Sequence, residues 1–308
     1  MKLSFVFPGQ GSQFVGMGRE LYISSPAARA VFDKADEVLG FSLSDLCFNG
    51  PEEQLNDTQY AQPAIFTMSI AHLEAFREWM RETGQQFTPD FVAGHSLGEY
   101  SALVACGSLA FEDGLRLVWE RGRLMHEAGE DNPGGMAAVI GLAHDRLMGV
   151  VEQASSEGVV VIANSNSPIQ TVISGEVEAL LKAMELAKKE GAARVARLAV
   201  SIASHSPLMQ NAGVQLNQVL SNIHLTDPLV PLVANVTGTL CRTAEEVKRE
   251  LSEQLCKPVA WVASVRHMID EGATTFIEVG PGQVLSGLIR RISDDVQVLK
   301  LEDVMKEA

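Results

Sequence analysis

The segment Gly94-His95-Ser96-Leu97-Gly98 has the residue types and the spacing of a nucleophilic turn, the G-x-S-x-G pattern. Its two glycines allow a sharp turn between a strand and a helix, which leaves the Ser96 hydroxyl exposed at the apex. A helix that begins after the turn directs free N–H groups toward the same place, where they can stabilise negative charge. The pattern predicts a nucleophilic serine, although a glycine-rich turn without chemistry would have the same form.

A serine hydroxyl is a weak nucleophile at neutral pH and needs a general base. Ser206-Pro207 is a helix-start signal, which places His205 just before a helix N-terminus, where the positive end of the helix dipole disfavours a charged imidazolium. His205 is therefore the candidate base, although its position alone also fits a structural histidine, and no acid stands out as a third member. The other histidines lie in or beside helical patterns or next to Ser96: His72, His95, His126, His144, His224 and His267.

The elements that must position these residues are short apolar runs alternating with longer helical patterns, which is typical of a sheet flanked by helices. We expect strands at 3–7, 91–93 and 275–279, and helices at 62–80, 97–106, 111–128, 207–223, 244–255 and 283–292. The serine would then lie between the second of these strands and the helix that follows it.

The stretch from 136 to 198 has a different rhythm, with strands and helices in the order βαββαβ. That order is typical of a ferredoxin-like unit. We therefore predict a small domain, residues 133–198, inserted into a larger α/β domain formed by residues 1–132 and 199–308. The six elements are expected at 136–141, 143–156, 159–163, 171–174, 176–190 and 194–198.

Composition excludes several classes of function. The 308 residues include 24 Lys and Arg against 39 Asp and Glu, a net charge of −15, which disfavours binding to nucleic acid or to anionic membranes. The four scattered cysteines indicate reduced thiols and neither a disulfide framework nor a zinc site. No apolar run approaches the length of a membrane span, and the first strand is too short for a signal peptide. We expect a soluble cytoplasmic protein.

Five motifs stand in order along the chain, and together they are far more specific than any one alone. With them the sequence resembles the malonyl-CoA:acyl carrier protein transacylases of type II fatty-acid synthesis, which are related to the acyltransferase domains of polyketide synthases. The resemblance runs from about Leu3 to Ile292 and implies an α/β fold: an α/β-hydrolase-like core with a parallel sheet and a ferredoxin-like insertion. The motifs are Phe7-Pro8-Gly9-Gln10-Gly11-Ser12-Gln13, Gly94-His95-Ser96-Leu97-Gly98-Glu99-Tyr100, Arg121-Gly122, Ser204-His205-Ser206 and Glu278-Val279-Gly280-Pro281-Gly282.

The resemblance implies transfer of malonyl from coenzyme A to the phosphopantetheine thiol of an acyl carrier protein, through a malonyl-serine intermediate and without metal or cofactor. Without the resemblance, Arg121 would be interpreted as a solvated helix residue. The implied roles are nucleophile for Ser96, base for His205, oxyanion-hole N–H groups for Gln10 and Leu97, carboxylate clamp for Arg121, site lining for Gln254, and orientation of the histidine at Asn235.

Several alternatives stay open at this stage. Ser204, just before the histidine, leaves the choice between malonyl and methylmalonyl undecided, and the pathway could be fatty-acid or polyketide assembly. A serine thioester hydrolase and a non-enzymatic carrier-binding module are rival functions. We expect a monomer. An acidic carrier protein would need a local basic patch, for which ordinary solvated faces are an equal explanation: Lys182, Lys188, Lys189, Arg194, Arg197, Arg290 and Arg291.

Overall fold

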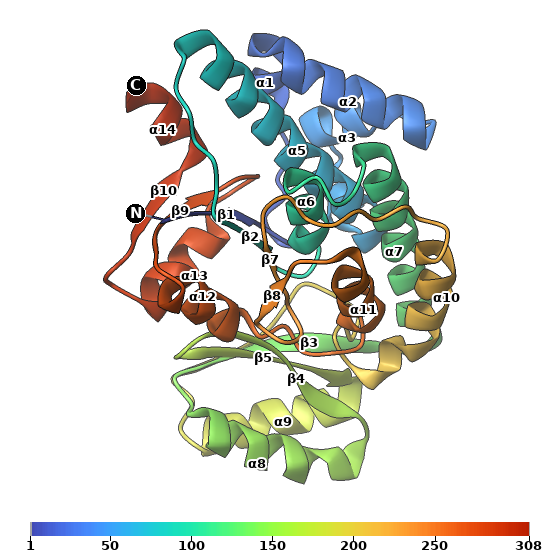
Figure 1. Cartoon of the computed structure of the whole chain (residues 1–308). Coiled ribbons are helices and arrows are strands. Elements are labelled where there is room, and N and C mark those ends of the chain that lie inside the picture. Colours follow the sequence, from blue (N-terminus) through green and yellow to red (C-terminus); the bar gives the residue numbers. More distant parts are fainter. Residues whose placement is uncertain (1, 308) are drawn as a thin grey trace.

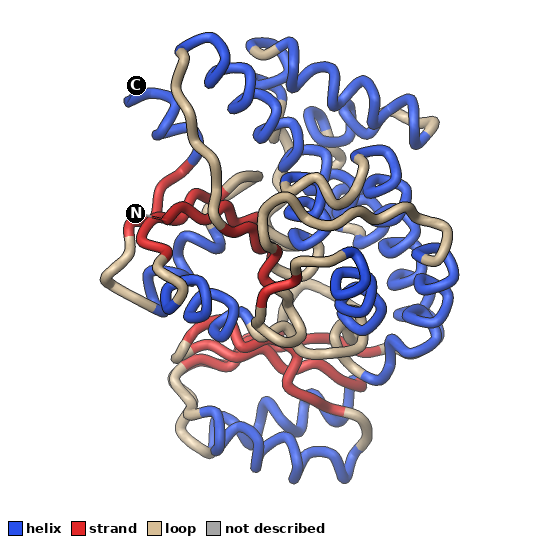
Figure 2. The backbone as a smooth tube through the Cα atoms, viewed as in Figure 1, coloured by secondary structure: helices blue, strands red, loops and turns tan. Residues whose placement is uncertain are grey.

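The computed structural model describes residues 2–307, which form two sheets with helices packed against both (Figures 1 and 2). The strands are β1 (Lys2–Phe7), β2 (Phe91–Gly94), β3 (Gly134–Ile140), β4 (Val160–Ser167), β5 (Gln170–Glu176), β6 (Arg194–Arg197), β7 (Leu232–Val233), β8 (Leu240–Cys241), β9 (Ala273–Glu278) and β10 (Gln297–Lys300). The helices are α1 (Arg19–Ser24), α2 (Pro26–Leu39), α3 (Leu43–Asn49), α4 (Glu52–Asn56), α5 (Thr58–Thr83), α6 (Gly98–Ala105), α7 (Phe111–Asp131), α8 (His144–Ala154), α9 (Val177–Lys189), α10 (Gln210–Leu220), α11 (Ala244–Gln254), α12 (Trp261–Asp270), α13 (Val284–Ile292) and α14 (Leu301–Glu307).

The larger sheet has the strand order β10-β9-β1-β2-β7-β8 and is parallel except for the β7–β8 pair. Its central strands are apolar on both faces, as a sheet covered on both sides requires. Phe5 and Phe7 of β1 pack with α2, α5, α6 and α7, whereas Val6 packs with α12 and α13 on the opposite face. The predicted mixed α/β fold with a parallel sheet is therefore confirmed.

The carboxyl ends of β1 and β2 lie side by side, since Phe7 pairs with Gly94 in parallel register. The loop after β1 therefore approaches the turn after β2. In open α/β sheets, ligands bind at this end of the strands. The sheet thus brings the first two of the five sequence motifs to one place.

The smaller sheet is antiparallel, with the order β4-β5-β3-β6, and the chain passes through it as β3, α8, β4, β5, α9, β6. That sequence of elements matches the βαββαβ order predicted for 136–198. Helices α8 and α9 cover one face of this sheet, and the other face turns toward the larger sheet (Figure 1). The boundaries 133–198 enclose these six elements, and that they form a separate domain stays a prediction.

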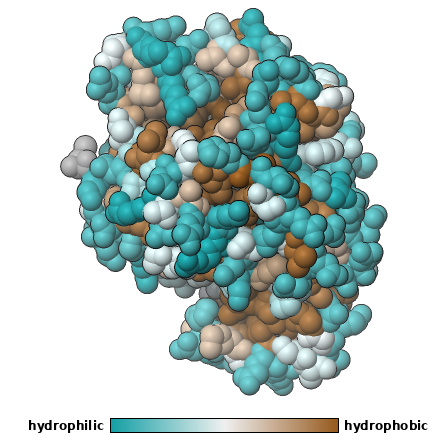
Figure 3. Space-filling view, turned by 45° about the vertical axis from the view of Figure 1, so that its right-hand side comes forward, coloured by the Kyte–Doolittle hydropathy of each residue, from teal (hydrophilic) through white to brown (hydrophobic). Residues whose placement is uncertain are grey.

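Some predicted bounds need correction. The predicted helix 207–223 begins as a 3-10 turn over Pro207–Met209, continues as α10 and ends at Leu220, so His224 lies beyond it. The predicted helix 62–80 starts earlier, at Thr58, where the side chain of Asp57 caps it. None of the helices within residues 2–307 is long and apolar enough to cross a membrane. Hydrophilic residues cover much of the face in Figure 3, with apolar patches between them.

Candidate active site

The turn between β2 and α6 has a backbone that only small residues allow. A Cβ on Gly94 would overlap the backbone of Gly98, and a Cβ on Gly98 would overlap the carbonyl of Phe7. Between the two glycines, Ser96 has a positive φ of 52°, which is uncommon for a residue with a side chain. Strained backbone of this kind concentrates at functional sites because the surrounding packing must enforce it.

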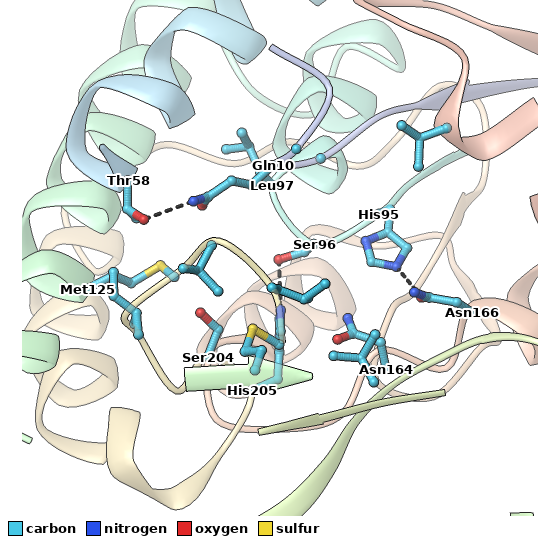
Figure 4. A pocket seen from close by; sticks show the side chains of 18 of the residues that line it. Gln10, Thr58, His95, Ser96, Leu97, Met125, Asn164, Asn166, Ser204 and His205 are labelled. Carbon is cyan, nitrogen blue, oxygen red and sulfur yellow. Dashed lines mark hydrogen bonds between the residues drawn. The ribbon is translucent and has the colours of Figure 1, made fainter. Parts of the chain in front are cut away.

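His205 meets Ser96 across a separation of 109 positions in the chain, with 2.8 Å between the Ser96 Oγ and the His205 Nε2 (Figure 4). His205 is 3% exposed and has a φ of 58°. Ser96 and His205 are the two non-glycine residues with positive φ in the described part of the chain. The structure therefore brings the predicted nucleophile and base within hydrogen-bond distance and strains the backbone at both.

The other ring nitrogen of His205 sets the direction of proton transfer. Its Nδ1 lies 2.9 Å from the carbonyl oxygen of Gln254 and 3.0 Å from that of Lys257. Carbonyl oxygens only accept hydrogen bonds, so Nδ1 carries the proton and Nε2 is left to accept from the serine hydroxyl. Gln254 ends helix α11, where backbone carbonyls have no partner within the helix. These two carbonyls stand where a triad would have an acid.

Asn235 does not orient the histidine, so that prediction is wrong. Its Oδ1 accepts a hydrogen bond from the Ser96 N–H at 2.7 Å, and its Nδ2 donates to the Gly94 carbonyl at 2.7 Å. The reason is topological: β7 pairs with β2, so the chain leaving β7 lies beside the turn and not beside the imidazole. Asn235 holds the nucleophile's backbone instead.

Arg121 is 1% exposed, so the interpretation as a solvated helix residue is also wrong. Its Nη1 donates to Gln62 Oε1 at 2.7 Å, and its Nη2 lies 3.0 Å from Ser96 Oγ and 3.1 Å from Gln254 Oε1. All three partners are neutral, and no salt bridge joins Arg121 to a carboxylate of residues 2–307. A buried guanidinium beside a nucleophile, with no carboxylate in direct contact, is suited to bind an anionic substrate group.

Gln10 and Leu97 line the cavity next to Ser96. Within the described residues, neither backbone N–H has a hydrogen-bond acceptor, although the Gln10 side chain is tied to Thr58 at 2.9 Å (Figure 4). The loop after β1 comes close enough to the turn that a Cβ on Gly9 would overlap the His95 carbonyl. Two free N–H groups on adjoining loops have the character of an oxyanion hole.

The cavity has a volume of about 440 Å³ and opens between the two sheets. Its walls come from the loop after β1, the β2–α6 turn, helix α13 and the face of the smaller sheet not covered by helices. Leu198 and Val284 line it and are partly exposed. The cavity therefore extends from Ser96 to partly exposed side chains of both parts of the protein.

The electrostatic environment keeps the base neutral. Burial, together with the positive charge of Arg121, lowers the pKa of His205 to about 3. Burial also lowers the pKa of His95, whose Nε2 lies 2.8 Å from Asn166 Oδ1. A neutral imidazole can accept the serine proton without first losing one of its own.

Three amide residues of the site, Gln62, Asn164 and Asn166, were not predicted from the sequence, whereas Gln254 was predicted but as a residue that lines the site. Gln62 and Gln254 share the Arg121 guanidinium, and Gln254 is a fully buried side chain that contacts Arg121 from behind the cavity instead of lining it. Asn164 and Asn166 line the cavity from β4. Nothing local in the sequence singles out these amides, because their role depends on the contact between the two sheets.

The sequence is similar to a known family and to several named proteins. Residues 4–306 match the family described as acyl transferase domain. The chain is 46% identical over 303 residues to the malonyl CoA-acyl carrier protein transacylase of Bacillus subtilis, covering 98% of this chain and 94% of the relative. It is 41% identical to the enzyme of the same name from Escherichia coli, with 98% and 96% covered.

Solved structures give the same picture. The malonyl CoA-acyl carrier protein transacylase from Coxiella burnetii superposes with a TM-score of 0.94 at 40% identity, covering 99% of this chain and 96% of that one. A malonyl-transacylase solved in complex with its type II polyketide synthase acyl-carrier protein also matches with a TM-score of 0.94, at 38% identity over the whole of both chains.

Proposed function

The chain belongs to the acyl transferase domain family, as a malonyl-CoA:acyl carrier protein transacylase, and from that premise we propose how its residues divide the reaction. Its acyl donor is malonyl-CoA and its acceptor is an acyl carrier protein. Ser96 is the acyl acceptor, His205 the base, and the N–H groups of Gln10 and Leu97 the oxyanion hole. The observation that carries this assignment is the 2.8 Å contact between Ser96 Oγ and a His205 imidazole fixed by two carbonyls.

In the first half-reaction, Ser96 Oγ attacks the thioester carbonyl while His205 Nε2 takes the hydroxyl proton. The tetrahedral oxyanion lies between the two N–H groups, each worth about 3 kcal/mol in comparable sites. Collapse breaks the C–S bond, and the proton on Nε2 passes to the departing thiolate of coenzyme A. The product is malonyl-Ser96, an oxygen ester.

In the second half-reaction, the phosphopantetheine thiol of the carrier protein enters the cavity vacated by coenzyme A. His205 removes the thiol proton, the thiolate attacks the ester carbonyl, and the same two N–H groups stabilise the second oxyanion. The Ser96 alkoxide leaves and recovers its proton from His205. This is ping-pong chemistry with one covalent intermediate.

Arg121 selects the malonyl group. Its planar guanidinium can bind the free carboxylate through two parallel hydrogen bonds, and an acetyl group has no counterpart. Its neutral partners, Gln62 and Gln254, hold the guanidinium in place without a direct ion pair, so it remains available to the substrate carboxylate. We propose that the pathway served is fatty-acid elongation, in a cytoplasmic monomer.

The assay that tests this function offers malonyl-, methylmalonyl- and acetyl-CoA with a phosphopantetheinylated carrier protein and weighs the products. We expect malonyl-carrier protein as the main product. Steady release of coenzyme A without carrier protein would indicate a thioester hydrolase instead. Absence of any acyl adduct would indicate a binding module. Methylmalonyl-carrier protein as the main product would indicate an enzyme of polyketide assembly.

The protonation state of His205 gives a prediction of its own. Because burial and Arg121 lower the pKa of His205 to about 3, its ring should stay neutral from pH 8 to pH 5, where an exposed histidine titrates near 6.5. The folded protein then takes up no proton there while the unfolded chain does, so this residue makes stability fall as the pH drops below about 6.5.

NMR of isotopically labelled histidines checks the prediction, with the His205 resonance assigned by its loss in His205→Asn. A pH-independent resonance between 8 and 5 is expected. Free imidazole in the same buffers gives the reference titration. A His205 midpoint near 6 would contradict the proposed neutral base.

The structure distinguishes among the seven basic residues that are candidates for contacting the carrier protein. Helix α9, with Lys188 and Lys189, covers the face of the smaller sheet opposite to the cavity. Helix α13 lines the cavity and carries Arg291, which is exposed and lies 3.4 Å from the side chain of Gln170 in β5. We propose that the α13 end of the patch receives the acidic carrier protein.

Arg291→Glu should therefore raise the KM for carrier protein several-fold, and more at low ionic strength, because charges at an interface rim mainly affect association. The KM for malonyl-CoA should change less. The double variant Lys188→Glu/Lys189→Glu is the matched control and should leave both constants unchanged. A raised KM for carrier protein in the lysine variant alone would place the docking surface on α9.

A further inference from the structure

One carboxylate lies directly beneath the nucleophile and is not part of the chemistry described above. Glu99, in the first turn of α6, is completely buried. Its Oε1 accepts hydrogen bonds from the backbone N–H and the side-chain Nδ2 of Asn235, both at 2.9 Å. Its Oε2 accepts from Gln254 Nε2 at 2.6 Å. Three donors thus converge on one carboxylate.

The two residues that Glu99 holds contact the reacting groups. Asn235 accepts from the Ser96 N–H, and Gln254 Nε2 donates to the Ser96 carbonyl at 2.8 Å. Gln254 also accepts from Arg121 through its side chain and from His205 through its backbone carbonyl. The nucleophile, the base and the carboxylate clamp each therefore contact a residue that is hydrogen-bonded to Glu99.

Glu99 also decides which way the Gln254 amide faces. The Nε2 group must point to the carboxylate, which turns Oε1 toward the guanidinium of Arg121. With a donor in place of the carboxylate, the amide could turn over and present its NH₂ group to the guanidinium. Arg121, whose direct partners are neutral, has in Glu99 a negative charge relayed through that amide.

A second buried carboxyl group, Glu250, helps to define the charge of Glu99. Burial and Glu250 raise the pKa of Glu99, and burial raises the pKa of Glu250 to about 7. Glu99 accepts hydrogen bonds from three N–H groups, whereas Glu250 accepts one, from the Val236 N–H at 2.7 Å. Burial and Glu250 thus raise the pKa of Glu99 well above its ordinary value, but the three donors that face it leave no acceptor within residues 2–307 for a proton on Glu99, so the hydrogen-bond pattern favours a carboxylate there.

We propose that Glu99 is a positioning residue for acyl transfer, whose carboxylate holds Asn235 and Gln254 so that Ser96, His205 and Arg121 keep one reactive arrangement. The proposal rests on the function proposed above. It assigns no contact between Glu99 and substrate. Its consequence is that loss of the carboxylate slows the chemical step in molecules that remain folded.

Rapid-quench acylation with labelled malonyl-CoA separates a positioning role from a structural one. The amplitude counts molecules able to react, and the rate constant reports the arrangement of the site. In Glu99→Gln, the new amide must direct its NH₂ group at another donor. We expect a rate constant reduced about 100-fold, the loss typical of a small misplacement of reacting groups, with the amplitude of the folded fraction retained.

Glu250→Gln is the matched control, because it removes a second buried carboxyl, which contacts the residue next to Asn235, while the amide oxygen can still accept from the Val236 N–H. Its rate constant should stay within about threefold of wild type. A Glu99→Gln rate constant equal to that of Glu250→Gln, at any amplitude, would overturn the proposal. Absence of a malonyl adduct in the wild-type protein would instead refute the proposed function.

Should Glu99→Gln fail to fold, Glu99→Asp gives the second test. It keeps the charge and both acceptor oxygens but is one methylene shorter, so it reaches Asn235 and Gln254 poorly. We expect a rate constant about tenfold below wild type at full amplitude. A wild-type rate constant in this variant would show that the site does not depend on where the carboxylate lies.

Discussion

Alanine in place of Ser96 should eliminate the malonyl adduct and lower malonyl transfer by at least about 10⁴-fold, because the intermediate can no longer form. Labelled malonyl-CoA is mixed with the protein, and the adduct is located by intact-protein and peptide mass spectrometry. In the wild-type protein we expect one malonyl group on the peptide that contains Ser96. The backbone there has a φ of 52°, which serine and alanine resist alike, so folding should be little affected.

Ser204 provides the matched control for this experiment. It lines the same cavity and adjoins the base, yet within residues 2–307 its hydroxyl makes no hydrogen bond to a base. Ser204→Ala should keep the adduct on Ser96 and most of the transfer activity. An adduct that persists in Ser96→Ala, or that maps to another residue in the wild-type protein, would remove Ser96 from the role of nucleophile.

The parts of this site that could be predicted from sequence are those that depend on local rules. The strand–turn–helix around Ser96 requires glycines at fixed positions, and the overlaps at Gly94 and Gly98 explain why the pattern carries structural information. The helix-start signal at Ser206 likewise placed His205 on a loop, where its side chain is free to reach the serine. Both depend on residues within a few positions of each other.

Contacts between distant elements could not be predicted in the same way. Asn235 reaches Ser96 over 139 positions and Gln254 over 158, so neither has a local pattern that indicates its partner. Strands β7 and β8 have two residues each, too short for any periodicity. The wrong role for Asn235 follows from this, since only the pairing of β7 with β2 places it at the turn.

The burial of Arg121, in contrast, was present in the sequence as a pattern. Leu117 and Val118 precede it by four and three positions, and Leu124 and Met125 follow it by three and four. Residues at these spacings share one face of a helix, and all four are buried with Arg121. A charged residue in the centre of an apolar stripe indicates a functional site more strongly than its chemical type alone would suggest.

Removing that guanidinium should change selectivity more than it changes the basic chemistry. Arg121→Ala should lower kcat/KM for malonyl-CoA by about 10²- to 10³-fold, the loss of a buried charge-assisted pair worth a few kcal/mol. Acetyl-CoA has no carboxylate to bind, so its transfer should be largely spared. Parallel assays with the two donors, each with the same carrier protein, give the ratio directly.

Two further arginine variants complete the test: one separates the shape of the Arg121 side chain from its charge, and the other is a control on the same helix. Arg121→Lys keeps a positive charge but has no planar fork, and should recover only part of the malonyl activity. Arg123→Ala, on the same helix, removes a partly exposed side chain that pairs with Glu120 and Glu127, and should change neither donor. Equal losses with malonyl and acetyl donors in Arg121→Ala would mean that the guanidinium supports Ser96 and Gln254 instead of the substrate. The ratio of the two donors therefore distinguishes a residue that binds the malonyl carboxylate from one that only holds the site together.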